Sequence, residues 1–491
     1  MTSTVSRTLS FFCCLVAASL LAPGLRSHAQ IGGCNVDAYV ASEMKAQQIP
    51  GISFAVVRGG TVVQSGARGL ANVELNAPAT AVTEFAIASM TKSVTASAVL
   101  LLVQDGRLSL DDAVEKYLAV PDSWKGMTVR QLLSHTAGVK DHFGDFPKYP
   151  RLTIDRRLSY TPEEYLQAHF DAPLNFAPGA EWAYSGGGYV ILGAILEKIT
   201  GRSYGDYLRD RIFRPLGMEH THIISVTDVI ANRASGYWFR DGALRNGGYT
   251  GQAHISGPDV GVMTTAGDFT KWLIAVSTPR LWTSASRDAM WTPAHLSDGR
   301  DAAGPPLGAS HGLGWSIGRY GRYTIVGHGG SLVNGFRSIF FFIPEKQTGV
   351  VVLTNQYDVD PNLIARGIAG RCDPELRPPH ERQTEADREP AATDRAKAFL
   401  AALLTSGDVS PFVTDGFLKH LSGMSRTPPP PPNGTPPPVS FVARDDLSPP
   451  LMRYGDAVVR LAHYKITVGT ETHWATLYLT ASGRVADVAG Y

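Results

Sequence analysis

The most informative segment of this 491-residue chain reads Ile87-Ala88-Ser89-Met90-Thr91-Lys92-Ser93-Val94-Thr95. Ser89 and Lys92 form the motif S-x-x-K at the start of a helix predicted over residues 91–104. One helical turn places the two side chains on the same face, so the amine can lie beside the hydroxyl. A lysine with a depressed pKa can take the proton of a serine, and a helix N-terminus favours a developing anion. By itself, the motif is also explained by a capping serine and a surface lysine.

Further motifs follow this segment in order along the chain. They are Gly106-Arg107-Leu108-Ser109-Leu110-Asp111-Asp112, Leu132-Leu133-Ser134-His135-Thr136-Ala137-Gly138, Tyr184-Ser185-Gly186-Gly187-Gly188-Tyr189, Arg214-Pro215-Leu216-Gly217-Met218, Gly312-Leu313-Gly314-Trp315 and Gly327-His328-Gly329-Gly330-Ser331. In this order they resemble the serine β-lactamase-like or penicillin-binding-protein-like family, which includes class C β-lactamases, D,D-carboxypeptidases, D-aminopeptidases and related esterases. The resemblance covers residues 36–369 and does not extend to the tail.

The resemblance implies a role for each matched residue. Ser89 corresponds to the acylated nucleophile and Lys92 to its proton acceptor. Tyr184 corresponds to the phenol that relays a proton to the leaving group. The matched segment for substrate binding and the oxyanion hole consists of His328, Gly329, Gly330 and Ser331. By the same alignment, the backbone N–H groups of Ser89 and Ser331 form the oxyanion hole, and such donors lower the barrier by several kcal/mol.

Two positions depart from the family pattern. Gly186 stands where the family usually has Asn, so a side-chain amide that contacts the acylamino group of the substrate is missing. His328 replaces the permanent cation of a Lys-Thr-Gly triplet, and a histidine is only partly charged near neutral pH. Both changes favour an esterase or a peptidase over an efficient β-lactamase. The natural substrate stays open among an ester, a D-amino-acid peptide and a β-lactam.

These residues predict a serine hydrolase that cleaves an ester or amide bond through an acyl-enzyme on Ser89, without a metal or organic cofactor. The expected partner is a small-molecule or peptide substrate. The alternative is a non-catalytic protein on the same scaffold that binds cell-wall peptides or a partner, and Gly186 together with the tail favours it. The presence of Ser89, Lys92 and Tyr184 favours the enzyme, because a pure binder has no chemical need for all three.

Three other motifs suggest chemistry but have simpler explanations. His135 follows a serine, yet in the matching family segment this histidine is structural. The run Glu219-His220-Thr221-His222 lacks a third metal ligand nearby. The run Gly308-Ala309-Ser310-His311-Gly312 matches the nucleophile elbow of α/β-hydrolases, which needs a strand before the serine and a helix after it. Here prolines precede the serine and a predicted strand follows, so we expect neither a metal site nor an elbow.

Hydrophobic periodicity predicts an α+β fold for residues 30–372. The expected helices are 36–48, 91–104 and 361–369, and the expected strands are 52–57, 61–64, 313–317, 323–326, 338–343 and 350–354. The simplest assembly is an antiparallel sheet flanked by helices, with a mostly helical second lobe and the site between the lobes.

The two ends of the chain differ from its middle. Residues 1–29 read as a signal peptide, with Arg7, an apolar run and a small-x-small cleavage pattern ending near Ala29, which predicts a secreted or periplasmic protein. An uncleaved membrane anchor is the alternative. Residues 373–394 suit a linker. Residues 395–491 suit a small accessory α+β domain, with a helix over 396–404, strands over 439–443, 456–468 and 472–479, and a proline-rich spacer.

Cysteine and charge content add two constraints. Cys34 and Cys372 flank the main domain and either form a disulfide in an oxidising compartment or are two unrelated thiols. The 45 Lys and Arg residues balance 44 Asp and Glu residues, and the absence of a basic stripe argues against nucleic acid as a partner. After signal removal no apolar run is long enough to span a membrane. The oligomeric state stays open.

Overall fold

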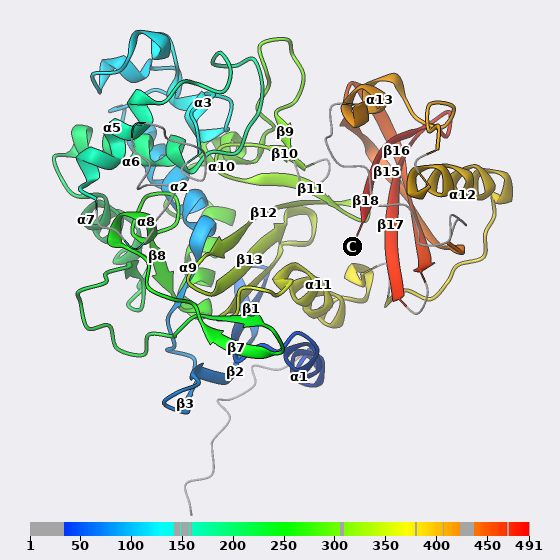
Figure 1. Cartoon of the computed structure of the whole chain (residues 1–491), viewed down its shortest axis with the longest axis horizontal. Helices are drawn as coiled ribbons and strands as arrows, with labels where there is room; N and C mark the ends of the chain where they lie inside the picture. Colours follow the sequence, from blue (N-terminus) through cyan, green and yellow to red (C-terminus); the bar gives the residue numbers. More distant parts are fainter. Residues whose placement is uncertain are drawn as a thin grey trace, which may run out of the picture. The chain divides into compact units, whose positions relative to one another are not determined.

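The computed structural model describes residues 34–141, 148, 157, 160–304, 309–378, 381–405, 407–422, 437–468 and 471–490. The predicted signal peptide over 1–29 lies outside these residues, as does most of the proline-rich spacer. A nine-stranded sheet in the order β3-β2-β1-β14-β13-β12-β11-β10-β9 organises the part of the chain before residue 372 (Figure 1). All of its neighbouring strands are antiparallel. The predicted α+β fold with an antiparallel sheet is confirmed.

The strands of this sheet are β1 (Gly51–Arg58), β2 (Thr61–Asn72), β3 (Ala77–Pro78), β9 (Ala303–Gly304), β10 (Ala309–His311), β11 (Ser316–Tyr320), β12 (Tyr323–Leu332), β13 (Phe336–Ile343) and β14 (Thr348–Thr354). Strands β2 and β12 run beyond their predicted ends, and β3, β9 and β10 were not predicted. The strand predicted over 313–317 was wrong at its start, because β11 begins only at Ser316. Gly314 has a φ of +79°, in the left-handed region, and this conformation interrupts an extended backbone.

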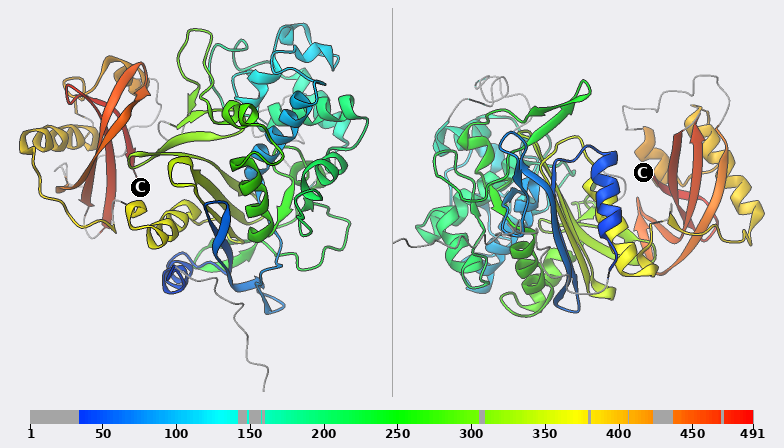
Figure 2. Two further views of the ribbon diagram at one scale, coloured as in Figure 1. Left: turned by 180° about the vertical axis from the view of Figure 1, so that it is seen from behind. Right: turned by 90° about the horizontal axis from the view of Figure 1, so that it is seen from below.

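Alternate residues of the central strands pack on opposite faces of the sheet. In β13 and β14, one face carries Phe340, Phe342, Val351 and Leu353, and the other carries Phe341, Ile343, Val350 and Val352. The first set joins a large core with α2 (Thr91–Gln104) and α9 (Ala266–Ser277). The second joins α1 (Asp37–Ala46) and α11 (Pro361–Cys372), which lie together on one side of the sheet (Figure 2). The bounds of α2 coincide with the predicted helix over 91–104.

Short helices and two small sheets fill the middle of the chain, in agreement with a mostly helical second lobe. The helices are α3 (Val129–Leu133), α5 (Pro162–Asp171), α6 (Gly186–Thr200), α7 (Tyr204–Leu208), α8 (Gln252–Ile255) and α10 (Ser284–Trp291). The small sheets are β4 (Phe85–Ala86), β8 (Val262–Thr264) and β5 (His222–Ile223) in the order β4-β8-β5, and the hairpin of β6 (Tyr237–Arg240) with β7 (Ala243–Asn246). Within the described ranges, none of the helices combines the length and apolar character needed to cross a membrane.

The tail has a separate four-stranded antiparallel sheet, coloured orange to red in Figure 1. Its elements are α12 (Pro390–Leu404), α13 (Asp415–Ser422), β15 (Val439–Arg453), β16 (Asp456–Val468), β17 (Glu471–Thr480) and β18 (Val485–Gly490). Phe399 and Phe417 of the two helices join Tyr464 and Leu477 of the sheet in one core. The sequence did not predict α13 or β18, and α12 begins at Pro390, inside the predicted linker. The domain boundaries themselves stay predictions.

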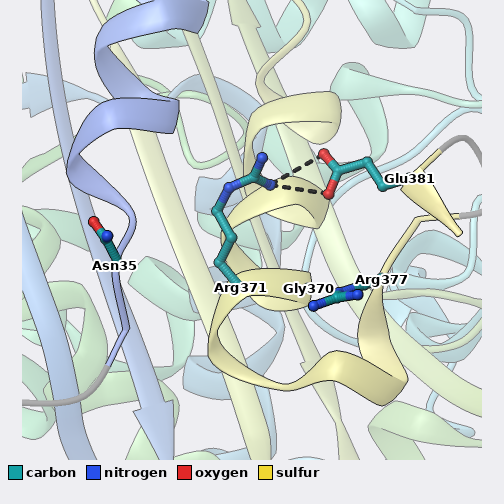
Figure 3. A pocket seen from close by; sticks show the side chains of 5 residues that line it. All are labelled: Asn35, Gly370, Arg371, Arg377 and Glu381. Carbon is teal, nitrogen blue, oxygen red and sulfur yellow. Dashed lines mark hydrogen bonds and ion pairs between the residues drawn. The ribbon is translucent and has the colours of Figure 1, made fainter.

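Cys34 and Cys372 form a disulfide bond, which decides between the two alternatives left by the sequence. The bond joins the residues just before α1 to the last residue of α11, and these two helices share a core. A cavity of about 330 Å³ is lined by Asn35, Gly370, Arg371, Arg377 and Glu381, which are labelled in Figure 3. There the Arg371 guanidinium donates to both carboxylate oxygens of Glu381 at 3.0 Å.

Candidate active site

Ser89 lies in a short 3₁₀ turn (Ala88–Met90) that leads directly into α2. Ala88 has a φ of +50°, a left-handed conformation that costs free energy for a residue with a Cβ. Such strain persists only where surrounding contacts enforce it. Here β8 does so, because Val262 exchanges hydrogen bonds with Ile87 and Thr91 on either side of Ser89. The Ser89 side chain is partly exposed at this entrance to the helix.

Lys92 brings the predicted catalytic residues together. Its Nζ donates to the Ser89 hydroxyl at 3.2 Å and to the backbone carbonyl of Asp259 at 3.0 Å. The same ammonium lies 4.9 Å from the centre of the Tyr184 ring and 3.9 Å from a carboxylate oxygen of Asp259. The lysine side chain is only 1% exposed. The S-x-x-K spacing therefore produces the contact that helical geometry predicts, and Tyr184 joins it from a distant part of the chain.

The pKa of Lys92 depends on its burial and on two neighbouring groups. Burial is the largest single influence and would lower the pKa of Lys92. Attraction to Tyr184 and Asp259 opposes burial and leaves the pKa of Lys92 above its ordinary value. The depressed pKa that would make a lysine a base at neutral pH is not found here, because Asp259, far along the chain, faces the amine. Lys92 is an ammonium at neutral pH in this site.

The segment that carries Tyr184 is held by His135. The backbone N–H of Ser185 donates to His135 Nδ1 at 3.1 Å, and the two rings of His135 and Tyr184 lie 4.5 Å apart between centroids. Burial keeps the pKa of His135 well below its usual range, so the ring is neutral and its Nδ1 can accept. This is a structural use of His135, as the sequence predicted.

The glycines after Tyr184 begin a helix. The Ser185 hydroxyl accepts from the backbone N–H of Gly188 and caps α6. The backbone N–H of Gly186, the position where the family usually has Asn, donates to a carboxylate oxygen of Asp141 at 2.9 Å. At this position the chain therefore offers backbone but no side-chain amide, as expected.

Strand β12 passes close to the residues just before Ser89. A Cβ at Gly330 would lie 2.2 Å from the carbonyl oxygen of Ile87, so only glycine allows this approach. The Ser338 hydroxyl on β13 donates to the same carbonyl at 2.7 Å. Ser331 follows Gly330 in β12 and is partly buried, whereas Gly329 is exposed. The predicted substrate segment thus runs along the strand nearest to the nucleophile.

His328 is 7% exposed at the start of this segment. Burial, reinforced by the Lys92 cation, lowers the pKa of His328 to about 4. The sequence predicted a partly charged histidine, but with this pKa His328 is neutral near pH 7. His311 is a second buried imidazole, whose ring centroid lies 4.5 Å from that of Trp182, and burial lowers the pKa of His311 to about 3.

Sequence reasoning missed three residues near the reactive groups. Asp259 and Asp141 both raise the pKa of Lys92, and His311 lies 6.0 Å from His135 between ring centroids. No local motif marks the two aspartates, since each acts across a long sequence separation. His311 occurred only in the rejected elbow, and that rejection agrees with the structure, because Ser310 lies in β10 and β11 follows it.

The two histidines of the Glu219–His222 run lie beside a buried carboxylate. His220 and His222 are half-exposed and face the buried carboxylate of Glu84 at 3.5 Å and 3.2 Å. They are thus paired to a side chain rather than merely at the surface. In the part of the chain that the structure describes, His, Cys, Asp and Glu side chains form no group able to hold a metal ion.

Comparisons with known proteins identify the family of this chain. Residues 36–370 match the beta-lactamase family. The chain belongs to that family. It is 29% identical over 329 residues to Protein flp of Staphylococcus aureus (strain MW2), a match that covers 65% of this chain and 62% of flp. The chain therefore matches less than two thirds of the length of that relative.

Two solved structures share the fold. The octameric penicillin-binding protein homologue from Pyrococcus abyssi has a TM-score of 0.61 at 23% identity, covering 93% of this chain and 99% of that one. The D-amino acid amidase from Ochrobactrum anthropi SV3, complexed with L-phenylalanine, has a TM-score of 0.58 at 26% identity, covering 69% and 96%. The chain thus has the hydrolase fold of beta-lactamases and penicillin-binding proteins. The likeness to the first structure includes the tail, which the family match does not reach.

Proposed function

We propose that this protein is an exported serine hydrolase that cleaves an ester or amide bond through an acyl-enzyme on Ser89. The observation that carries the proposal is the contact of the Lys92 ammonium with the Ser89 hydroxyl, with Tyr184 on the same ammonium. A nucleophile, a charged partner and a second proton-carrying group within reach of one another are the requirement for covalent catalysis.

The raised pKa of Lys92 refines the roles. An amine that keeps its proton at neutral pH is a poor base at rest, so the lysine and the phenol act as a pair. In the reacting form of the pair, Lys92 and Tyr184 together hold one proton fewer than their full number, and the Ser89 proton fills that place.

The reaction has two stages, formation of the acyl-enzyme and its hydrolysis. The Ser89 oxygen bonds to the substrate carbonyl carbon while its proton passes to the Lys92–Tyr184 pair, and backbone N–H groups of Ser89 and Ser331 hold the oxyanion. The bond to the leaving group then breaks, and the leaving group takes the proton from Tyr184. In the second stage water attacks the ester carbon, gives a proton to the same pair, and releases the acid and the free Ser89 hydroxyl.

Gly186 and the neutral His328 favour an ester or a peptide-like amide over a β-lactam as the substrate. Two features support export: the signal-like pattern over 1–29 and the Cys34–Cys372 bond. Disulfides persist mainly in oxidising compartments.

Ser89→Ala tests the proposal, with Ser93→Ala as the matched control. Ser93 lies one turn further along α2, where its hydroxyl donates to the Gly314 carbonyl at 2.6 Å instead of meeting Lys92. A fluorophosphonate probe is expected to label the wild type and the Ser93 variant but not the Ser89 variant. Turnover of p-nitrophenyl esters, nitrocefin and D-aminoacyl anilides is measured in parallel. Labelling or turnover that survives without Ser89 contradicts an acyl-enzyme at this residue.

A further inference from the structure

The loop before β8 holds a carboxylate against the buried end of Lys92. Oδ2 of Asp259 lies 3.9 Å from Nζ of Lys92, and the backbone carbonyl of the same aspartate accepts from Nζ at 3.0 Å. The two side chains are only 4% and 1% exposed. A charge removed from water to this extent is costly unless an opposite charge lies beside it. Asp259 supplies that opposite charge from outside the motifs that the sequence singled out.

Backbone groups fix this loop along the first turns of α2. Besides the bond from the amine to the loop carbonyl, the Thr95 hydroxyl lies 2.5 Å from the carbonyl oxygen of Pro258. The backbone N–H of Val262 donates to the Thr91 hydroxyl at 3.0 Å. None of these three contacts uses the carboxylate. The charge can therefore be removed while the amine keeps its anchor on the loop.

Two other groups favour the ammonium form of Lys92. The centre of the Tyr184 ring lies 4.9 Å from Nζ, and the Asp141 carboxylate also raises the pKa of the lysine, less than Tyr184 and Asp259 do. Asp141 is partly exposed and accepts a hydrogen bond from the backbone N–H of Gly186. Solvent screens an exposed charge more than a buried one. Asp259 is thus the anion that acts on the amine at closest quarters.

The remaining titratable neighbours carry no charge near neutral pH. Burial lowers the pKa of His135 and of His328, and the Lys92 cation lowers both further. Tyr189 of α6 has its ring centre 5.7 Å from Nζ, and burial raises its pKa. Burial also raises the pKa of Tyr204, which faces the same aspartate. Neutral rings on these elements leave the carboxylate as the main opposing charge.

We propose that Asp259 is a positioning residue that acts through the Lys92 ammonium and sets the pH above which the Lys92–Tyr184 pair can accept the Ser89 proton. The inference rests on the proposed function and adds a residue to it. In that function the pair reacts after it has given up one proton. A negative charge 3.9 Å from the ammonium favours the more positive form of the pair, whichever of the two groups gives up the proton. Ionised Asp259 therefore moves the reacting form to higher pH.

Asp259→Asn tests this, because it removes the charge and keeps the size of the side chain and the backbone carbonyl. The measurement is kcat/KM for p-nitrophenyl acetate between pH 5 and pH 10, after subtraction of the rate of Ser89→Ala. The rise of kcat/KM with pH is expected to move to lower pH by about 1–3 units, the usual effect of an opposite charge at this range. A smaller movement, or a movement to higher pH, overturns the inference.

Asp268→Asn is the matched control. Asp268 of α9 is also a buried aspartate, but it pairs with Lys271 at 2.7 Å and accepts from the backbone N–H of His220. Its loss removes a buried carboxylate away from Lys92, so the pH curve should stay in place. Asp259→Glu restores the charge and should return the curve toward that of the wild type. A movement that Asp268→Asn shares, or that Asp259→Glu leaves uncorrected, excludes a charge effect of Asp259.

NMR of protein labelled with carbon-13 at the lysine Cε atoms follows the proton of Lys92 directly, with its signal assigned by its loss in Lys92→Arg. In the wild type the amine is expected to stay protonated beyond the ordinary lysine pKa of 10.5, and in Asp259→Asn to titrate at lower pH. Loss of the proton below 10.5 in the wild type overturns the inference even without a folded variant.

Failure of the proposed function is a separate outcome. It would abolish Ser89-dependent hydrolysis of p-nitrophenyl esters and leave the NMR titration of Lys92 measurable. If ester hydrolysis persists while neither the kinetic curve nor the titration responds to Asp259→Asn, only the inference about Asp259 fails.

Discussion

Replacing Gly330 by alanine tests how β12 builds the site. The new Cβ would lie 2.2 Å from the Ile87 carbonyl oxygen and 2.2 Å from the Ser338 hydroxyl, where real Cβ contacts under 3.0 Å are essentially never seen. The hydroxyl can rotate away, but the carbonyl belongs to the backbone two residues before Ser89. The strand and the Ser89 turn must therefore separate by about 0.8 Å, the difference between the two distances.

A shift of this size acts on the oxyanion hole rather than on folding alone. Displacement of reacting groups by about 1 Å costs roughly 10²-fold in rate, and loss of one oxyanion donor costs about 10²–10³-fold in kcat. We expect kcat for p-nitrophenyl esters to fall about 100-fold in Gly330→Ala, with a smaller change in KM. Overpacking should also lower the free energy of unfolding by about 1–3 kcal/mol.

Gly318→Ala is the matched control. It places the same methyl group in the neighbouring strand β11, where the Cβ would meet only the Ile325 side chain at 3.5 Å, an ordinary contact. Steady-state kinetics and thermal unfolding of both variants separate an active-site effect from a general loss of stability. If Gly330→Ala is folded and keeps kcat within about threefold of the wild type, the close approach of β12 to Ile87 does not set the catalytic geometry.

Two further predictions concern stability. Replacing Cys34 and Cys372 together by serine should lower the free energy of unfolding by about 2–5 kcal/mol, because the disulfide closes a loop of 338 residues. Unfolding in guanidinium measures this change, and an unchanged unfolding midpoint would contradict the prediction. Burial, reinforced by Asp268, raises the pKa of Glu84 to about 7. Between pH 4.5 and 7 the folded state then binds more protons at Glu84 than the unfolded state, so stability falls as pH rises. Glu84→Gln should flatten this fall in thermal unfolding measured from pH 5 to pH 8, and parallel curves for variant and wild type would exclude Glu84 as its cause.

The parts of the fold that depend on local pattern were predicted from the sequence. Helix α2 has its predicted bounds, because a continuous helical pattern ends at a glycine. The alternation of Phe340 to Ile343 and of Val350 to Leu353 fixes two faces of the sheet. Strand β11 was misplaced, because the left-handed Gly314 lies within an apolar run that reads as a strand. In the tail, β18 was missed because the short segment contains few strand-specific residues.

The candidate site also has a part that local sequence predicts and a part that depends on residues far apart in the chain. Ser89 and Lys92 are three positions apart, across the 3₁₀ turn and the start of α2, so their contact follows from helical geometry. The position of Tyr184 follows from resemblance and is brought about by the His135 hydrogen bond, which a pattern does not show. Asp259 reaches Lys92 across 167 residues, and no rule of spacing places it there.

The charge of the site depends on those long-range neighbours rather than on residue type. Burial acts in the same direction on Lys92 and His328, since it lowers the pKa of both bases. Lys92 faces Tyr184 and Asp259 and keeps its proton, whereas His328 faces the Lys92 cation and loses its own. The positive charge on Lys92 therefore makes protonation of His328 unfavourable. The site holds one cation beside the nucleophile instead of two.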